Sequence, residues 1–198
     1  YIRIAMSAHI RIIEETVLSD SWYLLKKTVF DLLRRDGTWQ RQTRENYDRG
    51  NGAAILLYNR TGKTVILTRQ FRFPTFVNGN ADGMLTEVCA GLLDQDDPVT
   101  CIRRETEEET GFRVHDVRQV FDAYMSPGAV TERIHCFVGE YAPSDKVSAG
   151  GGEAQEGEDI EVIETTLDDA LNQVADGRIR DAKTIMLLQY ARLHHLVD

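Results

Sequence analysis

The chain has 198 residues, of which 42% are hydrophobic and 28% charged, and its formal net charge is −9. This length allows one well-buried domain with extensions, and the composition is typical of globular proteins. The acidic balance argues against nucleic acid as a partner, because that binding needs clustered basic residues. No apolar run approaches the roughly 20 residues of a membrane span, and no secretory signal is visible. We therefore expect a cytoplasmic protein without a membrane partner.

At the N-terminal end, residues 22–33 alternate well enough to predict a β-strand. Arg35, Asp36 and Gly37 supply a turn into a second strand that ends near Tyr47. We interpret residues 1–47 as an antiparallel strand region outside the catalytic core, and residues 48–198 as the main domain.

The main domain is predicted to contain short apolar strands at 53–58, 64–68, 84–89, 117–124, 131–141 and 160–163. The first two are joined by a turn at 59–63, while Pro74 and several glycines indicate a loop at 73–83. Residues 143–158 lack periodic apolarity and contain a glycine run, which favours a mobile acidic loop. Thr166 and Asp181 can begin two terminal helices, the first ended by Gly177. In the second, Ile185, Leu188, Ala191 and Leu193 supply a partial apolar stripe. This order predicts an α/β/α sandwich around a mixed sheet.

The three cysteines, Cys89, Cys101 and Cys136, are odd in number and lack the spacing of a zinc finger. Their surroundings favour buried small residues over ligands. We therefore expect reduced thiols, in agreement with a cytoplasmic location.

Residues 104–112 read Arg-Glu-Thr-Glu-Glu-Glu-Thr-Gly-Phe. On an α-helix, positions i, i+3 and i+4 share a face, so Glu105, Glu108 and Glu109 project to one side. Three carboxylates this close raise one another's pKa values unless water or cations neutralise them. Oxygen ligands alone favour hard cations, Mg²⁺ or Mn²⁺ before zinc.

A glutamate run on a helix is most often a solvated face. Its surroundings here favour a defined helix, because Asp96 and Asp97 can cap its start and Pro98 suits the first helical position. Gly111 stands where a left-handed residue commonly ends a helix. A turn of small residues at 90–94 leads into this helix. We interpret the helix as a metal-binding helix.

The residues of this segment resemble the Nudix box, Gly-x5-Glu-x7-Arg-Glu-U-x-Glu-Glu-x-Gly-U, in which U is apolar. They are Gly91, Asp97, Arg104, Glu105, Glu108, Glu109 and Gly111. Asp97 replaces a glutamate of the pattern and Thr106 an aliphatic residue. Gly91 lies one residue closer to Arg104 than the pattern requires. We interpret Arg104 as an organiser of the neighbouring carboxylates.

Most of the chain from Leu18 onward is similar to the branch of the Nudix family that hydrolyses GDP-mannose, a relative of the ADP-ribose pyrophosphatases. That branch shares the shortened box, and the resemblance extends over residues 47–53, 89–94, 124–128, 149–152, 158–162 and 180–184. It implies a Nudix fold, dependence on Mg²⁺ with Mn²⁺ as an alternative ion, and a homodimer that exchanges N-terminal strands. The implied reaction is the hydrolysis of GDP-mannose to GMP and mannose 1-phosphate.

Carried over residue by residue, the resemblance implies four metal ligands: the backbone carbonyl of Ala90 and the carboxylates of Glu105, Glu109 and Glu158. Glu108 is implied as a further metal-associated carboxylate in the catalytic set. The implied substrate contacts are Trp22, Thr43, Arg44, Glu45, Arg72, Glu132 and Lys183. Trp22 departs from a smaller aromatic residue of the family, and Thr43 departs from a basic one.

Two other functions stay open. The turn at Ser126, Pro127 and Gly128 also resembles that of ADP-ribose pyrophosphatases, so ADP-ribose or another nucleotide sugar is an alternative substrate. A nucleotide-sugar sensor without turnover is a further alternative. The retained glutamates of residues 104–112 speak against the sensor, because losing one would be the simplest way to abolish catalysis.

Overall fold

The computed structural model describes residues 8–197, so the first seven residues of the predicted N-terminal region lie outside it. The chain divides into two compact units. The N-terminal unit extends to Gly50 and includes Ser126–Glu132, and the second unit comprises Asn51–Met125 with Arg133–Asp198.

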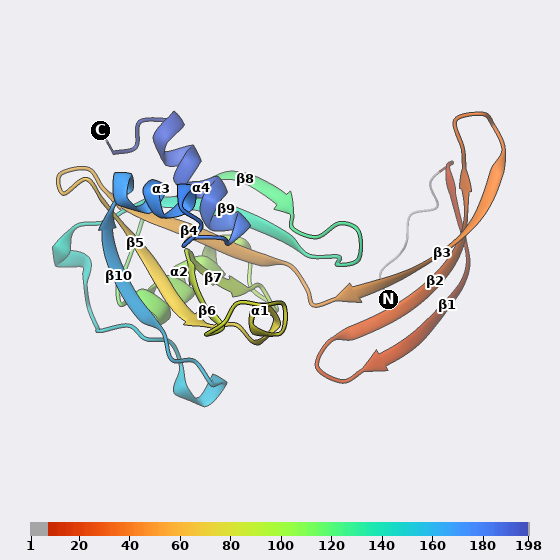
Figure 1. Ribbon diagram of the computed structural model, residues 1–198, viewed down its shortest axis with the longest axis horizontal. Helices are drawn as coiled ribbons and strands as arrows, with labels where there is room; N and C mark the ends of the chain where they lie inside the picture. Colours follow the sequence, from red (N-terminus) through yellow and green to blue (C-terminus); the bar gives the residue numbers. More distant parts are fainter. Residues whose placement is uncertain (1–7, 198) are drawn as a thin grey trace. The chain divides into compact units, whose positions relative to one another are not determined.

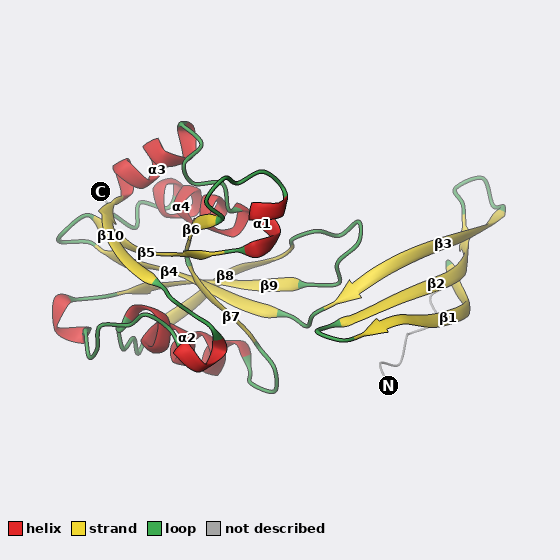
Figure 2. Ribbon diagram, turned by 60° about the horizontal axis from the view of Figure 1, so that its bottom comes forward, coloured by secondary structure: helices red, strands yellow, loops and turns green. Residues whose placement is uncertain are grey.

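The N-terminal unit is an antiparallel sheet in the order β1-β2-β3 (Figure 2). Its strands are β1 (Ile10–Asp20), β2 (Leu24–Leu33) and β3 (Trp39–Asp48). The predicted hairpin is confirmed, with Gly37 at a φ of 81° in the turn. β1 lies outside the predicted strands, although its isoleucine, threonine and valine residues favour a strand. The expected start at Trp22 is wrong, because Trp22 lies between β1 and β2 and is 83% exposed.

The second unit is built on a mixed sheet in the order β10-β5-β4-β9-β8 (Figure 1). These strands are β4 (Gly52–Asn59), β5 (Thr64–Phe71), β8 (Val117–Tyr124), β9 (Arg133–Glu140) and β10 (Glu161–Thr166). β4 and β9 run parallel, and the other pairs are antiparallel. The predicted strands at 53–58, 64–68, 117–124, 131–141 and 160–163 are confirmed, with small shifts at their ends.

The central sheet forks between β4 and β5. These strands pair only from Leu57 to Asn59 on β4, and beyond that point two short strands fill the gap. β6 (Met84–Glu87) pairs with β5, and β7 (Cys89–Leu92) pairs with β4. The predicted strand at 84–89 is therefore two strands, and the turn expected at 90–94 begins only after Leu92. The fork leaves β7 directly beneath a helix.

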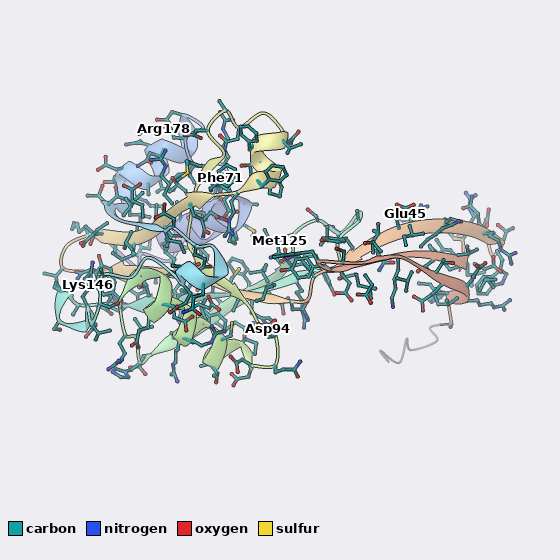
Figure 3. All side chains as sticks on the ribbon, turned by 90° about the horizontal axis from the view of Figure 1, so that it is seen from below. Glu45, Phe71, Asp94, Met125, Lys146 and Arg178 are labelled. Atoms are coloured by element: carbon teal, nitrogen blue, oxygen red, sulfur yellow. The ribbon has the colours of Figure 1, made fainter. Side chains whose placement is uncertain are left out.

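The helices cover both faces of this sheet (Figure 2). They are α1 (Phe73–Val77), α2 (Pro98–Thr110), α3 (Leu167–Ala175) and α4 (Ala182–Leu193). α2 packs on β7 and β4 on one face, while α4 contacts β4 and β9 on the other. The predicted α/β/α sandwich is confirmed. α1 occupies part of the loop expected at 73–83, and Phe71 lies beside it (Figure 3).

β4 shows why the layers form. All its residues are buried, and alternate side chains enter opposite cores. Ala54 and Leu56 pack with α4 residues such as Leu188, whereas Ile55 and Leu57 pack with Ile102 and other residues of α2. A strand with two buried faces needs a covering layer on each side.

The two terminal helices, α3 and α4, begin after the predicted N-cap residues Thr166 and Asp181. The Thr166 hydroxyl accepts from Asp169 N at 3.0 Å, and Asp181 accepts from Thr184 N at 2.9 Å. One position of the predicted stripe on α4 is wrong, because Leu193 is 75% exposed and Leu187 is buried instead. No helix in residues 8–197 is long and apolar enough to cross a membrane.

Candidate active site

Helix α2 begins and ends as its sequence predicts. Asp97 is the N-cap, and its carboxylate accepts from Val99 N and Thr100 N at 3.0 and 3.1 Å. Gly111 has a φ of 76° and ends the helix. The Asp97 carboxylate is therefore engaged in capping, which gives this position of the box a structural role.

Glu105 lies against the backbone of β7. A Cβ on Gly91 would stand 2.1 Å from Glu105 Cδ, so only glycine at 91 leaves room for this carboxyl group. Glu105 also pairs with Arg104 Nη1 at 3.0 Å, and the same nitrogen reaches Glu108 at 2.9 Å. The interpretation of Arg104 as an organiser of carboxylates agrees with these contacts.

Glu109 lies one turn further along α2 and is 2% exposed. Its Oε2 accepts from Ala90 N at 3.2 Å, which places the carboxylate beside the second residue of β7. The expected carbonyl donor at Ala90 and two of the expected carboxylates therefore lie along one contact between α2 and β7.

Glu158 reaches the same contact through the glycine run that precedes it. Gly151 N and Gly152 N donate to the carbonyl groups of Glu109 and Glu108 at 2.9 and 3.1 Å. Gly150 has a φ of 71°, and a Cβ there would stand 2.6 Å from Glu109 O. The glycines allow this loop to pack on the end of α2, and the Glu158 carboxylate accepts from Glu153 N at 2.9 Å.

The acidity of this cluster is strongly altered. Burial raises the pKa of Glu109 to about 7, and the nearby charges of Glu105 and Glu158 add to the effect. Burial likewise raises the pKa of Glu105 to about 7, with Glu108 and Glu158 adding and Arg104 opposing. These contributions put Glu105, Glu109 and Glu158 within electrostatic reach of one another.

The residues fit a hard divalent cation by their chemistry. In the part of the chain that the structure describes, no three acidic, histidine or cysteine side chains are grouped closely enough to hold a metal ion. Glu105 pairs with Arg104, and Glu109 accepts from Ala90 N. Glu105, Glu109 and Glu158 form a set of oxygen donors. A bound divalent cation would reduce the repulsion among their carboxylates.

Arg72 and Lys183 lie together, joined by a buried carboxylate that the sequence did not single out. Glu87 Oε2 accepts from Arg72 Nε at 2.6 Å, and Oε1 accepts from Lys183 Nζ at 2.5 Å. The sequence held one signal for Glu87, which is its position as a glutamate within the predicted apolar strand at 84–89. A charged residue buried in such a strand must be paired.

The remaining predicted contacts belong to the N-terminal unit. Thr43, Arg44 and Glu45 are exposed on β3, where Glu45 is labelled in Figure 3. Successive strand residues face opposite sides, so Arg44 does not share a face with the other two. Glu132 is paired with Arg49 at 3.4 Å, and Trp22 packs edge-on to Tyr23.

The three cysteines are buried and free, as predicted. Cys89 and Cys101 belong to the core beneath α2, and Cys136 belongs to the opposite core. Burial raises the pKa of the Cys101 and Cys136 thiols to about 12, so they remain protonated at neutral pH.

The sandwich, with its glutamate helix packed against a glycine-containing strand, agrees with the family comparisons. Residues 48–188 match the NUDIX domain, and residues 9–47 match the GDP-mannose pyrophosphatase NudK N-terminal domain. The chain belongs to the Nudix hydrolase family.

Relatives match over the whole chain. It is 59% identical to a GDP-mannose pyrophosphatase of Pectobacterium atrosepticum over 94% of the chain and 95% of that protein. It is 55% identical to one of Salmonella arizonae over 97% of the chain and 100% of the relative. The crystal structure of an ADP compounds hydrolase shares the fold, with a TM-score of 0.69, 19% identity and coverage of 93% and 92%.

Proposed function

We propose that this enzyme hydrolyses the diphosphate of GDP-mannose, giving GMP and mannose 1-phosphate in a Mg²⁺-dependent reaction. The observation that carries the proposal is full-length similarity, at 52–59% identity, to proteins named GDP-mannose pyrophosphatase. The buried carboxylates at the contact of α2 with β7 support it, because hydrolysis of a diphosphate needs charge neutralisation and an activated water.

In this proposal Glu105, Glu109, Glu158 and the Ala90 carbonyl hold the cation. When bound, Mg²⁺ would neutralise the diphosphate and lower the pKa of a water molecule. Glu108 is held by Arg104 at the rim of this set, where it can orient water or accept a proton. Glu158 is held by Glu153 N, beside the glycine run, and its charge acts on both Glu105 and Glu109.

The two cations joined by Glu87 can supply hydrogen-bond donors for the substrate. Arg72 is half-buried and lies near Glu109. Burial lowers the pKa of its guanidinium, but the charge of Glu87 and, to a smaller extent, that of Glu109 outweigh this and raise it. We propose that Arg72 and Lys183 contact the diphosphate, since arginine in particular suits phosphoryl oxygens.

The N-terminal unit is proposed to supply the remaining substrate contacts and the dimer. Residues 1–47 form this region in the proposal, and residues 48–198 form the hydrolase domain. Trp22, Thr43, Arg44, Glu45 and Glu132 are the proposed contacts. Several large apolar side chains of β1 are exposed, which favours a partner strand or sheet. Light scattering of the purified protein should therefore give a dimer mass.

The test is incubation with GDP-mannose, with Mg²⁺ or with EDTA, followed by separation of the nucleotide products. We expect GMP only in the presence of a divalent cation. A parallel reaction with ADP-ribose compares AMP with GMP release, and faster AMP release would replace GDP-mannose by ADP-ribose as the substrate. Binding of nucleotide sugars with no metal-dependent product from either would leave a sensor and refute the enzyme.

A further inference from the structure

Glu87 is the last residue of β6 and is 3% exposed. Its two carboxylate oxygens are divided between two cations that lie far apart in the sequence, Arg72 at 2.6 Å and Lys183 at 2.5 Å. A carboxylate removed from water needs such partners, because an unpaired buried charge is strongly destabilising. Glu87 is thus the residue through which the two cations are joined.

Lys183 is held on two sides. Its Nζ also donates to Asp181 Oδ1 at 3.0 Å, and its side chain is 12% exposed. Asp181 caps α4 through Thr184, and the hydroxyl of Thr184 accepts from Val88 N at 2.8 Å. The start of α4 is therefore tied to β6 and to the residue that follows it, and Lys183 has little freedom to move.

Arg72 is held differently. Its side chain is 39% exposed, and Nε makes its one hydrogen bond to a side chain within the part of the chain that the structure describes. A guanidinium group bonded through Nε keeps both terminal nitrogens available, and their fixed fork matches two phosphoryl oxygens. Arg72 therefore combines a fixed plane with two donors for a ligand.

The network as a whole is neutral, because the charges of Arg72 and Lys183 offset those of Glu87 and Asp181. It attracts an anion less by net charge than by the placement of its donors. Placement matters for a reacting group, since small errors in geometry can lower the rate or affinity strongly.

We propose that Glu87 is a positioning residue that fixes Arg72 and Lys183 for contact with the diphosphate of the substrate. The inference rests on the proposed function, in which a diphosphate binds beside Glu105 and Glu109. Glu87 itself touches neither substrate nor metal, and it acts through the two cations.

The test is a double-mutant cycle of Glu87→Gln and Arg72→Ala on the full-length enzyme. Glu87→Gln keeps the shape but has one acceptor for two donors, and we expect KM to rise about tenfold or more with kcat within about threefold. In the Arg72→Ala background the same change should raise KM far less, because the residue it positions is absent. An equal rise in both backgrounds would overturn the positioning of Arg72.

Two further variants separate positioning from folding. Glu87→Asp keeps the buried charge but is one methylene shorter, so it cannot reach both cations and should also raise KM. Glu164→Gln is the control, since Glu164 accepts from Tyr141 and Thr64 at 2.6 and 2.8 Å outside this network, and its KM should equal that of the wild type. A fall in kcat at unchanged KM in Glu87→Asp would indicate a structural role only.

A binding measurement distinguishes this inference from the proposed function. Calorimetry with GDP in EDTA reports the diphosphate contacts without turnover, and Glu87→Gln should weaken GDP about tenfold or more. If no nucleotide sugar is hydrolysed but GDP binding weakens as expected, the proposed reaction fails and the positioning role stands. Equal GDP affinity in the wild type and the variant, or no GDP binding to the wild type, overturns the positioning role.

Discussion

Removing the charge of Glu109 should stabilise the metal-free protein at alkaline pH. Burial is the main reason that the pKa of Glu109 rises from the ordinary 4.5 to about 7 in the folded state. The folded protein therefore binds this proton more tightly than the unfolded chain does. The resulting stability is fully present below about pH 4.5 and is lost as the pH rises through 7.

The size of the effect follows from these two pKa values. A difference of one pKa unit corresponds to about 1.4 kcal/mol. Ionisation of Glu109 alone therefore lowers the unfolding free energy by about 3 kcal/mol above pH 7. Glu105 has a similar pKa, and its charge acts on Glu109, so the two protons leave in coupled steps. Glu109→Gln removes one charge and retains an amide oxygen that can accept from Ala90 N.

Urea unfolding in EDTA at several pH values from 5 to 8.5 measures this. The wild type should lose stability over that range, whereas Glu109→Gln should lose about 3 kcal/mol less, because Glu105 still titrates, and should be the more stable protein at pH 8. Glu107→Gln is the matched control on the same helix, because Glu107 is paired with Arg113 and its pKa is lowered. Parallel stability curves for the wild type and Glu109→Gln would exclude Glu109 as a source of the loss at high pH.

Magnesium should reverse the order at pH 8. A cation that binds the folded protein stabilises it, by about 2.7 kcal/mol at a concentration of 100 times its Kd. Wild-type unfolding should shift to higher urea with added Mg²⁺, and the shift should be small in Glu109→Gln. An equal shift in both proteins would remove Glu109 from the metal site.

Three further predictions concern the surroundings of the cluster. Gly91→Ala should lower kcat about 100-fold or more while the far-UV CD spectrum is retained, because its Cβ would displace the Glu105 carboxyl group; wild-type turnover would contradict the packing. Glu158→Gln should retain nucleotide-sugar binding in calorimetry and lose most of kcat, and unchanged turnover would remove Glu158 from the mechanism. Gly150→Ala should lower the unfolding free energy by about 1–3 kcal/mol, since its φ is positive and its Cβ would meet Glu109 O. Gly128→Ala is the control, since a Cβ there would meet nothing within 4 Å, and its unfolding free energy should equal that of the wild type. Equal losses in Gly150→Ala and Gly128→Ala would exclude the backbone conformation and contact of Gly150 as the cause.

Much of the second unit could be predicted because its signals are local. Alternation and length identified the strands, and the caps of α2, α3 and α4 stand at Asp97, Thr166 and Asp181. Each of these signals depends on residues within a few positions of one another. The fork of the sheet was not predictable in this way, because a single run at 84–89 changes partner strands at Val88.

The N-terminal unit was harder to predict because its strands bury little. All residues of β1 are exposed in this chain, so no contrast between a buried and an exposed face marks the strand. Glu87 was not predicted as part of the site because its partners lie far from it in the sequence. Its partners come from positions 72 and 183, and no spacing in the sequence shows that a strand end and a helix start will meet.

The three departures from the Nudix box are each accommodated by local structure. The shortened spacing is taken up in a tight turn, where Asp94 has a φ of 46° and Asp96 N donates to Leu93 O at 2.7 Å, so Gly91 still lies against Glu105.

Thr106 takes the aliphatic position because its hydroxyl donates to Ile102 O within the helix, which satisfies the polar group in a fully buried site. Asp97 caps the helix that carries the carboxylate cluster. Since each departure leaves Glu105 and Glu109 against β7, the pattern tolerates changes that preserve this contact. We therefore expect substitutions that separate α2 from β7 to impair the enzyme more than changes in the spacing of the box.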